Sequence, residues 1–471
     1  MRERGLAPEF STDALRQAEA LVGPAQDADP AIKDLRGLPW SSIDNDDSRD
    51  LDQVEVAERL GDGACTVRVA IADVDSCVGA GSPIDAHALL NTTSVYTAAQ
   101  IFPMLPERLS TNLTSLAEDQ ERLAIVFEMT IAPDGQVLES SLYRALVRNQ
   151  AKLAYAAVAA WLEGRAGAPA RVQESRELQQ QLRLQDEVAQ QLRGLRHQHG
   201  ALDLQTEEAR AVFDNGLLSD LKPEPQNRAH ELIEDLMIAA NGVSASYLQR
   251  KGLPSIRRVL RTPERWDRLV LMARELGDAL PAVPDAAALN AFLQRRKRVD
   301  PEHFADLSLR VVKSLGSGEY ALQRPGAGSA GHFALATRDY AHSTAPNRRF
   351  PDLLTQRLLK ASLQGRPSPY SETELQGLAA HCTVQENNAA KVERQVRKSA
   401  AAMLLASRVG QRFKGIVTGV SDKGTWVRVT SPAAEGRIIR GYEALDVGDP
   451  VSVELIHTDI ARGFVDFARC R

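Results

Sequence analysis

The sequence predicts an α+β protein followed by a smaller β-barrel domain, and three features of its 471 residues support this. Residues 54–74 and 122–147 show the alternating apolar pattern of strands, each with a Gly-bearing turn inside. Residues 151–300 are mainly helical in pattern. From about residue 409 the chain changes to five short alternating segments, which is typical of a five-stranded OB-fold barrel.

The elements are expected in the following order. Residues 1–36 form an amphipathic helix, capped by Ser11 or Thr12, and a polar linker. Residues 37–405 form the main domain, in which 122–147 is a hairpin around the turn residues Pro-Asp-Gly. Residues 406–471 form the OB-fold domain. One helical segment carries an apolar stripe that indicates ordinary core packing: Leu178, Leu182, Val188, Leu192 and Leu195.

The composition is that of a soluble globular protein, with 43% hydrophobic and 25% charged residues. No apolar run approaches the length of a membrane span, and the first residues lack the apolar core of a signal peptide. The four cysteines are scattered without CxxC spacing, so neither a zinc site nor a disulfide framework is indicated. We expect a cytoplasmic monomer that does not bind membranes.

The net charge of −5 hides an uneven distribution of charge. Residues 1–60 carry 7 Lys and Arg against 14 Asp and Glu, whereas residues 248–298 carry 12 against 5 and residues 338–366 carry 6 against 2. Most single arginines on helices are simply solvated. Together, however, basic regions far in sequence from an acidic one suit an enzyme that binds a polyanion and cleaves it at a metal.

The acidic segment is SSIDNDDSRDLDQVEV, which starts at residue 41 and holds six carboxylates: Asp44, Asp46, Asp47, Asp50, Asp52 and Glu55. Acidic clusters are usually solvated loops. This one runs into a predicted buried strand, so several of its side chains must converge on one side. A bound cation would offset their mutual repulsion, and we therefore expect a metal site.

Two cations fit the spacing. As a calcium-binding EF-hand loop, the segment has Arg49 where the sharp turn requires glycine, and its flanks look like strands instead of helices. As a magnesium site, Asp50 and Asp52 lie two residues apart and face the same side of a strand, with Asp44 approaching from the preceding turn. Magnesium is the better fit, because such a group leaves coordination positions for a phosphodiester and a water.

Four segments together resemble the RNase II family of exoribonucleases and its RNB catalytic domain. The acidic signature reads IDNDDSRDLDQ, and residues 70–124 match the family's A-I-A-D-V, S-V-Y, P-M-L-P-E and L-S segments. AHELIEDLMIAAN (229–241) and YAHSTAPNRRFPDLLTQRLLKA (340–361) match two further motifs. The resemblance spans roughly residues 30–470 and implies an RNB-type fold, a curved mixed sheet flanked by helices, followed by an OB-type RNA-binding domain.

The resemblance also implies an activity and its residues. The family degrades single-stranded RNA processively from the 3′ end to nucleoside 5′-monophosphates with Mg²⁺, which Mn²⁺ can replace. By motif position, the catalytic residues are Asp44, Asp50, Asp52 and Arg348, and the metal ligands are these three aspartates with Gln53. The expected RNA contacts come from Tyr96 as a stacking aromatic, Glu234 at the terminal ribose, with Asp235 as its alternative, and Arg349 beside Arg348.

In the predicted barrel, Trp426 and Lys423 could bind single-stranded RNA by stacking and charge, together with Phe413 and Lys414. The competing interpretation is that the aromatic side chains fill the barrel core. For Trp426, in the strand-like stretch TWVRV, the pattern does not decide between the two.

Several positions depart from the family pattern. Gln53 stands where the family has a fourth Asp, which removes one negative charge from the metal site. The S-P-I-R segment has become A-P-N-R, with Ala345 and Asn347, and Leu204 stands where an aromatic residue is expected. Only about 36 residues precede the signature, where typical members carry two cold-shock domains. We therefore expect an open entrance and tolerance of structured RNA next to a single-stranded 3′ tail.

The sequence leaves two alternatives to a 3′→5′ exoribonuclease. The first is a non-catalytic RNA-binding protein in which Gln53 marks a weakened nuclease site. The second is a calcium-binding scaffold without turnover. The three aspartates and Arg348 favour the enzyme, because drift would have changed more than one of these positions.

Overall fold

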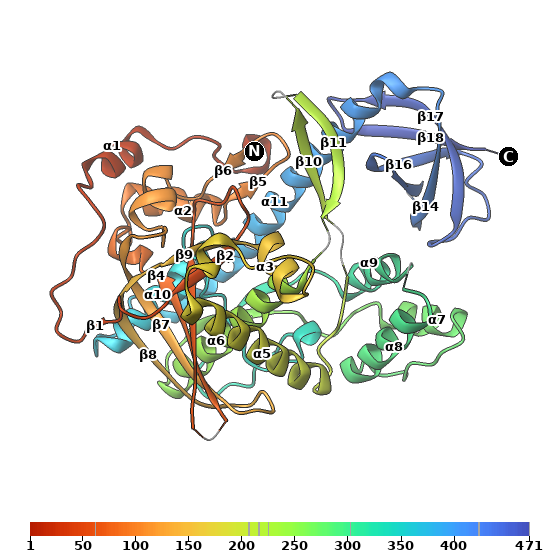
Figure 1. Ribbon diagram of the computed structural model, residues 1–471. Helices are drawn as coiled ribbons and strands as arrows, with labels where there is room; N and C mark the ends of the chain where they lie inside the picture. The colour runs from red at the N-terminus through yellow and green to blue at the C-terminus, as the bar shows by residue number, and fades with distance from the viewer. Residues whose placement is uncertain are drawn as a thin grey trace.

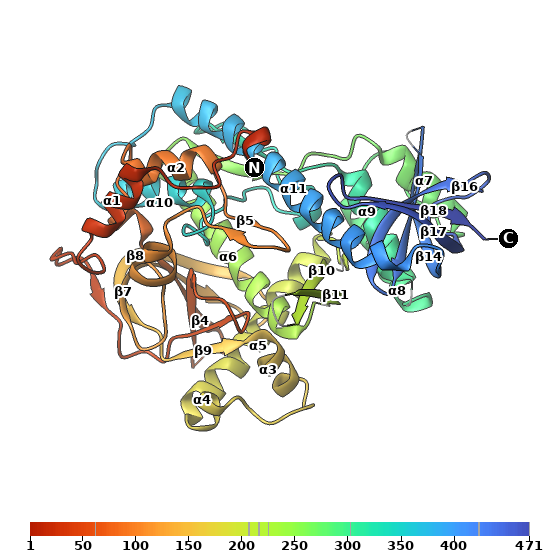
Figure 2. The ribbon, with the colours of Figure 1, turned by 90° about the horizontal axis from the view of Figure 1, so that it is seen from above.

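The computed structural model describes residues 1–470 except 62, 206–207, 215–216, 225, 302 and 423. A large α+β body and a smaller β-barrel lie at opposite ends of one long helix, α11 (Glu372–Leu405) (Figures 1 and 2). The predicted α+β class with a carboxy-terminal barrel is confirmed. No helix in the described part of the chain combines the length and the apolar composition that a membrane span requires.

The body is built on a seven-stranded mixed sheet in the order β1-β8-β7-β4-β3-β2-β9. Neighbouring strands are antiparallel, except that β1 runs parallel to β8 and β2 parallel to β9. The strands are β1 (Lys33–Asp34), β2 (Ser41–Asp44), β3 (Gln53–Arg59), β4 (Cys65–Ala72), β7 (Glu121–Ile131), β8 (Val137–Arg148) and β9 (Ala151–Ala154). The predicted hairpin of residues 122–147 is confirmed as β7 and β8.

Eight helices of the described chain belong to the body: α1 (Thr12–Ala20), α2 (Pro83–Asn91), α3 (Tyr155–Leu162), α4 (Ala170–Gln173), α5 (Arg176–Gln198), α6 (Arg228–Arg250), α10 (Phe350–Leu363) and α11. Ser11 caps α1 by accepting a hydrogen bond from the backbone N–H of Ala14, as one of the two predicted caps. The predicted stripe on α5 lies in the core at Leu178, Leu182, Val188 and Leu192, whereas Leu195 is only partly buried.

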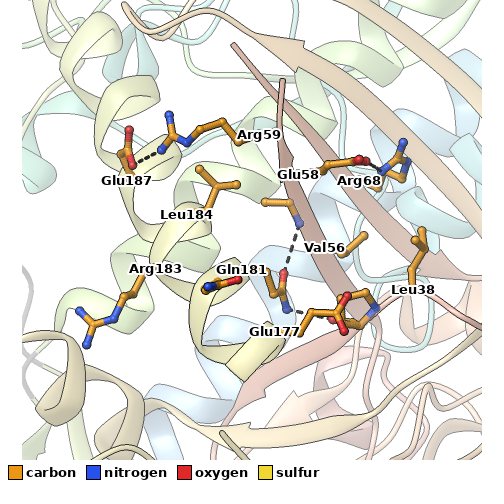
Figure 3. Close-up of a pocket in the computed structure, with 13 residues that line it drawn as sticks. Leu38, Val56, Glu58, Arg59, Arg68, Glu177, Gln181, Arg183, Leu184 and Glu187 are labelled. Atoms are coloured by element: carbon orange, nitrogen blue, oxygen red, sulfur yellow. Dashed lines mark hydrogen bonds and ion pairs between the residues drawn. The ribbon is translucent and has the colours of Figure 1, made fainter. Parts of the chain in front are cut away.

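Helix α5 covers the free edge of β3 beyond the end of the short strand β2 (Figure 3). The Gln181 side chain accepts a hydrogen bond from the backbone N–H of Ala57 at 3.2 Å and donates to the Pro39 carbonyl at 2.9 Å. A side-chain amide thus replaces the missing strand partner, because an exposed edge would leave backbone groups unpaired. Beside it lies a cleft of about 560 Å³ that none of the predicted site residues lines.

Residues 151–300 contain more strand than predicted. The segment includes β10 (Glu208–Asp214) and β11 (Leu217–Glu224), an antiparallel hairpin, and β12 (Ser255–Val259), which pairs with β13 (Glu319–Gln323). A separate core holds α7 (Trp266–Glu275), α8 (Ala286–Val299) and α9 (Phe304–Leu315). A small ribbon of β5 (Val95–Tyr96) and β6 (Ile101–Phe102) lies beside α11 (Figure 2).

The barrel closes in the order β14-β15-β16-β18-β17. Its strands are β14 (Arg412–Ser421), β15 (Gly424–Thr430), β16 (Ala433–Arg440), β17 (Pro450–Asp459) and β18 (Phe464–Arg469). Ala402 and Leu405, in the last turn of α11, belong to the barrel's apolar core. The end of this helix therefore packs as part of the barrel.

Candidate functional site

The acidic segment crosses from one strand of the main sheet to the next. Asp44 is the last residue of β2, Asp50 lies in the connecting loop, and Asp52 directly precedes β3. The loop is held by Ser115, whose hydroxyl donates to the Arg49 carbonyl at 2.7 Å and accepts from the backbone N–H of Leu51 at 3.1 Å. The aspartates therefore sit on anchored backbone, as a site requires.

Asp52 is only 1% exposed and makes two contacts with the segment that holds Asn347 and Arg348. Its Oδ1 accepts a hydrogen bond from the backbone N–H of Asn347 at 2.9 Å, and its Oδ2 accepts from Nε of Arg348 at 3.1 Å. Burial raises the pKa of the Asp52 carboxyl to about 7, against the opposing effect of the Arg348 charge. The structure thus brings together two predicted residues from distant parts of the chain.

Asp44 lies near the contact between Asp52 and Arg348, because the Arg348 charge acts on its carboxyl. Burial raises the pKa of its carboxyl to about 6, although Arg348 and hydrogen bonds from Ser42 and Gln53 favour the ionised form. The amide nitrogen of Gln53 is 3.4 Å from Asp44 Oδ1. Asp44 Oδ2 is buried and has no hydrogen-bond partner among the described residues. A carboxylate oxygen in this position is available for a ligand.

Tyr96 connects the third aspartate to the protein surface. Its hydroxyl donates to Asp50 Oδ2 at 3.3 Å, and its backbone N–H donates to Glu393 of α11 at 2.9 Å. The residue is 41% exposed. Its ring is therefore accessible beside the acidic group, where a base could stack on it.

The two neighbouring arginines point to different partners. The Arg348 side chain is 47% exposed and contacts Asp52. Arg349 instead forms an ion pair with Asp352 at 2.8 Å and donates to the Thr344 hydroxyl at 3.4 Å. Asp352 also accepts from the backbone N–H groups of Thr344 and Ala345. In this arrangement, Arg349 supports the loop that carries Arg348.

Helix α6 separates the two acids that the sequence left as alternatives. Glu234 is exposed, whereas Asp235 is buried and paired with Arg196 of α5. Burial raises the pKa of the Asp235 carboxyl to about 7. Asp235 thus serves the contact between two helices, and Glu234 is the acid left accessible to a ligand.

Trp426 lies on the outer face of the barrel. Thr425, Val427 and Val429 are buried in alternation along β15, while Trp426 and Arg428 are partly exposed. Arg428 pairs with Asp306 of α9. The outward position excludes the barrel-core interpretation for Trp426. Phe413, by contrast, packs edge-to-face on Phe467, and Lys423 lies outside the described residues.

The sequence reasoning missed Tyr155, which begins α3 directly after β9. Strand β9 pairs in parallel with β2, so that Ala154 lies opposite Asp44 and Tyr155 follows beside it. The Tyr155 ring stacks on His230 of α6, with ring centroids 3.9 Å apart. Burial raises the pKa of the Tyr155 hydroxyl, and the negative charge of Asp44 raises it further. Only the strand pairing places this residue at the site.

The residues at the site fit a hard divalent cation by their chemistry. Carboxylate and amide oxygens are the ligands that Mg²⁺ prefers, and the unpartnered Oδ2 of Asp44 is such a donor. Among the described residues, no three His, Cys, Asp or Glu side chains lie close enough together to hold a metal ion, so the structure does not gather the three predicted aspartates into one set of ligands. This is compatible with Mg²⁺, which usually takes only one or two carboxylates and keeps several waters.

Two known protein domains match the sequence of the chain. The RNB domain matches residues 32–365, and the RNase II-type exonuclease C-terminal S1 domain matches residues 411–470. A Ribonuclease R of Vibrio parahaemolyticus is 32% identical over 445 residues, which cover 90% of this chain and 52% of that protein. The chain thus spans about half the length of this relative.

Two solved structures share the fold. The Mycoplasma genitalium RNase R in complex with ribose methylated single-stranded RNA superimposes with a TM-score of 0.89 at 22% identity, covering 99% of this chain and 76% of that one. The same protein in complex with double-stranded RNA gives 0.87 at 23% identity, covering 100% and 82%. With its RNB domain and its RNase II-type S1 domain, the chain belongs to the RNB family, that of the RNase II exoribonucleases.

Proposed function

We propose that this protein is a Mg²⁺-dependent exoribonuclease that degrades single-stranded RNA processively from the 3′ end to nucleoside 5′-monophosphates. The observation that carries the proposal is the buried contact between Asp52 and Arg348, with Asp44 and Asp50 beside it. One buried and two partly buried acids near one partly exposed arginine suit a cation and a phosphate bound together. Membership of the RNB family supports the same conclusion.

In this proposal Asp44, Asp50, Asp52 and the Gln53 amide oxygen hold the metal, with Mn²⁺ as a substitute for Mg²⁺. When bound, the metal would lower the pKa of a water and offset charge on the phosphate. The Asp52 contact to Nε of Arg348 leaves both terminal nitrogens of that guanidinium without a hydrogen-bond partner among the described residues. These two donors can bind a phosphate in bidentate fashion, which stabilises charge that develops during cleavage.

The remaining residues position the RNA. The accessible ring of Tyr96 suits stacking of a base, and stacking tolerates every base, as processive degradation requires. Glu234 and Tyr155 are proposed to contact the terminal nucleotide. On the barrel, Trp426 and Lys423 are proposed to bind RNA further from the cleavage position. Arg349 is proposed to act through the loop that it supports, in addition to the RNA contact that its motif position implies.

We also propose that the protein acts as a cytoplasmic monomer. No disulfide bond joins the cysteines of the described chain, which suits a reducing compartment. The substrate is proposed to be single-stranded RNA, with tolerance of an adjoining structured region. The solved structures of the Mycoplasma genitalium RNase R include complexes with single-stranded and with double-stranded RNA, which supports testing such substrates.

The test is a gel time course on a short, unstructured, 5′-labelled RNA with Mg²⁺, run for the unaltered protein and for Asp52→Asn. A ladder that shortens to a small end product, and is absent for Asp52→Asn, is expected. A hairpin RNA with a 3′ tail, run in parallel, tests the tolerance of structure. Binding without shortening at every Mg²⁺ and Mn²⁺ concentration would overturn the proposal in favour of a non-catalytic RNA-binding protein, the less favoured alternative.

A further inference from the structure

Glu55 is a buried acid that no part of the proposed reaction uses. It lies in the middle of β3, paired with Val69 of β4 on one side and Ser41 of β2 on the other, and its exposed fraction is 0%. Among the described residues, neither carboxyl oxygen of Glu55 has a hydrogen-bond partner. Buried carboxyl groups are almost always paired, because an unpaired one is destabilising. Glu55 therefore requires a hydrogen-bonding partner that the described part of the chain does not supply.

The position of Glu55 in the strand connects it to the acidic site. Gln53 and Glu55 are two residues apart on β3, so their side chains lie on the same face of the sheet. The Gln53 amide reaches Asp44 on this face. Burial raises the pKa of the Glu55 carboxyl, and the nearby negative charge of Asp44 raises it further. Asp44, Gln53 and Glu55 thus form one group.

Protein cations do not balance this group. The two cations that act on Asp44 are Arg348 and Lys152. Arg348 is bound to Asp52, and Lys152 donates to the Asp46 carbonyl at 2.8 Å. No Lys, Arg or His side chain of the described chain hydrogen-bonds to either carboxyl oxygen of Glu55. Together, Glu55 and Asp44 present three buried carboxyl oxygens without a partner in the described chain. Such a set of oxygen donors matches a hard divalent cation.

The sequence departs from its family at this same point. Gln53 replaces the fourth aspartate of the signature, so the metal site lacks one negative charge. Glu55, two residues after Gln53 on the same face of β3, could supply this negative charge. The glutamate side chain is one methylene longer than aspartate, which extends its reach toward Asp44.

We propose that Glu55 is a further acidic ligand of the metal site, and that it supplies the carboxylate that position 53 lacks. The cation would then lie among Asp44, the Gln53 amide oxygen and Glu55, on the sheet side of the acidic segment. This inference rests on the proposed function, because it concerns the same metal. It adds a ligand that the signature of the family does not contain.

The test measures Mn²⁺ affinity by electron paramagnetic resonance, which counts free Mn²⁺ directly and needs no RNA. The proteins are the unaltered chain, Glu55→Gln, Gln53→Asp and the double variant Gln53→Asp with Glu55→Val. Glu58→Gln is the matched control, because Glu58 is an exposed acid on the same strand that faces the other side. Thermal unfolding without metal checks that each variant is folded.

Glu55→Gln is expected to weaken Mn²⁺ binding at least tenfold, and the double variant is expected to restore it, while Glu58→Gln leaves it unchanged. The double variant keeps the test decisive if Glu55→Gln does not fold. Equal Mn²⁺ affinity of Glu55→Gln and the unaltered chain would overturn the inference, and so would a double variant as weak as Glu55→Gln. RNA shortening by the unaltered chain in either case would leave the proposed function standing. No shortening and no Mn²⁺ binding would overturn both.

Discussion

Arg348 donates through Nε to Oδ2 of Asp52 at 3.1 Å, although 296 residues separate the two in the chain. Asp52 is 1% exposed and the Arg348 side chain is 47% exposed, so the pair links the buried core to the protein surface. An arginine held in this way keeps a fixed orientation and still presents two donors outward. The predictions below follow from this pair and its surroundings.

Arg348→Lys is expected to lower the rate of RNA shortening by about 10²–10³-fold, the usual loss when one donor to a developing charge is removed. A lysine has one ammonium group and cannot contact Asp52 and a phosphate in the same planar arrangement. Single-turnover gel kinetics measure the effect. Arg366→Lys, at an exposed arginine after α10, serves as the control and should retain the full rate.

Ionisation of Asp52 is expected to destabilise the metal-free protein as the pH rises from about 4 to about 7. The folded state holds a proton on Asp52 up to a pKa of about 7, whereas the unfolded chain loses it near 3.8. The folded state therefore binds more protons in this window, and up to about 1.4 kcal/mol is lost per pH unit.

Thermal unfolding in EDTA measures this effect, with Asp52→Asn as the comparison. The variant should unfold at a higher temperature than the unaltered protein near neutral pH, and the difference should shrink toward pH 4. Saturating Mg²⁺ should raise the unfolding temperature of the unaltered protein more than that of Asp52→Asn, because the variant lacks one proposed metal ligand. A difference in unfolding temperature between the two proteins that stays constant from pH 4 to pH 7 in EDTA would contradict the prediction.

Asn347→Ala is expected to reduce kcat about tenfold with little change in RNA affinity. The Asn347 side chain accepts a hydrogen bond from the Thr114 hydroxyl at 2.5 Å and thereby ties the arginine loop to the segment before β7. Without it, the Asn347 backbone contact to Asp52 remains but the loop is less constrained.

Thr114→Val should reproduce the defect of Asn347→Ala, and the double variant should be no worse than Thr114→Val alone, because both changes remove the Thr114–Asn347 hydrogen bond. Thr111→Val, which removes a hydroxyl bonded to a local carbonyl, is the control. Additive losses in the double variant would show that the two side chains act separately.

Trp426→Ala is expected to weaken RNA binding about tenfold, in the range of stacking on one base, while Trp426→Tyr retains most of the affinity. The residue lies on the outer face of β15 beside Arg428. Filter binding with a single-stranded RNA measures the affinity. If the affinity stays constant and thermal stability falls instead, Trp426 serves the contact of the barrel with the body.

Gly135→Ala is expected to destabilise the protein by about 1–3 kcal/mol. Gly135 has a φ of +87°, which L-residues with a Cβ rarely adopt, and an added Cβ would collide with the Gln191 backbone of α5. Urea unfolding measures the loss. Gly23→Ala is the control, because no described atom lies within 4 Å of its added Cβ.

Local sequence patterns predicted many of the secondary-structure elements. Strand alternation predicted the β7–β8 hairpin and the barrel, and a serine cap predicted the start of α1. Patterns of this kind depend on neighbours in sequence, so they can be read without the fold. The β10–β11 hairpin was missed because its flanks are helical and its alternation is weak. Tyr155 was missed because it reaches the site only through the parallel pairing of β9 with β2.

The sequence by itself determined the family, the α+β class with its barrel, and the acidic and arginine motifs, because spacing and order along the chain encode these. Only the tertiary structure decided which side chain meets which. It turned Arg348 toward Asp52 and Arg349 toward Asp352, and it buried Asp235 while exposing Glu234. It also left Glu55 without a hydrogen-bond partner among the residues that the structure describes. The physical reason is that side-chain direction and burial depend on strands and helices far apart in the chain, which adjacent residues do not specify.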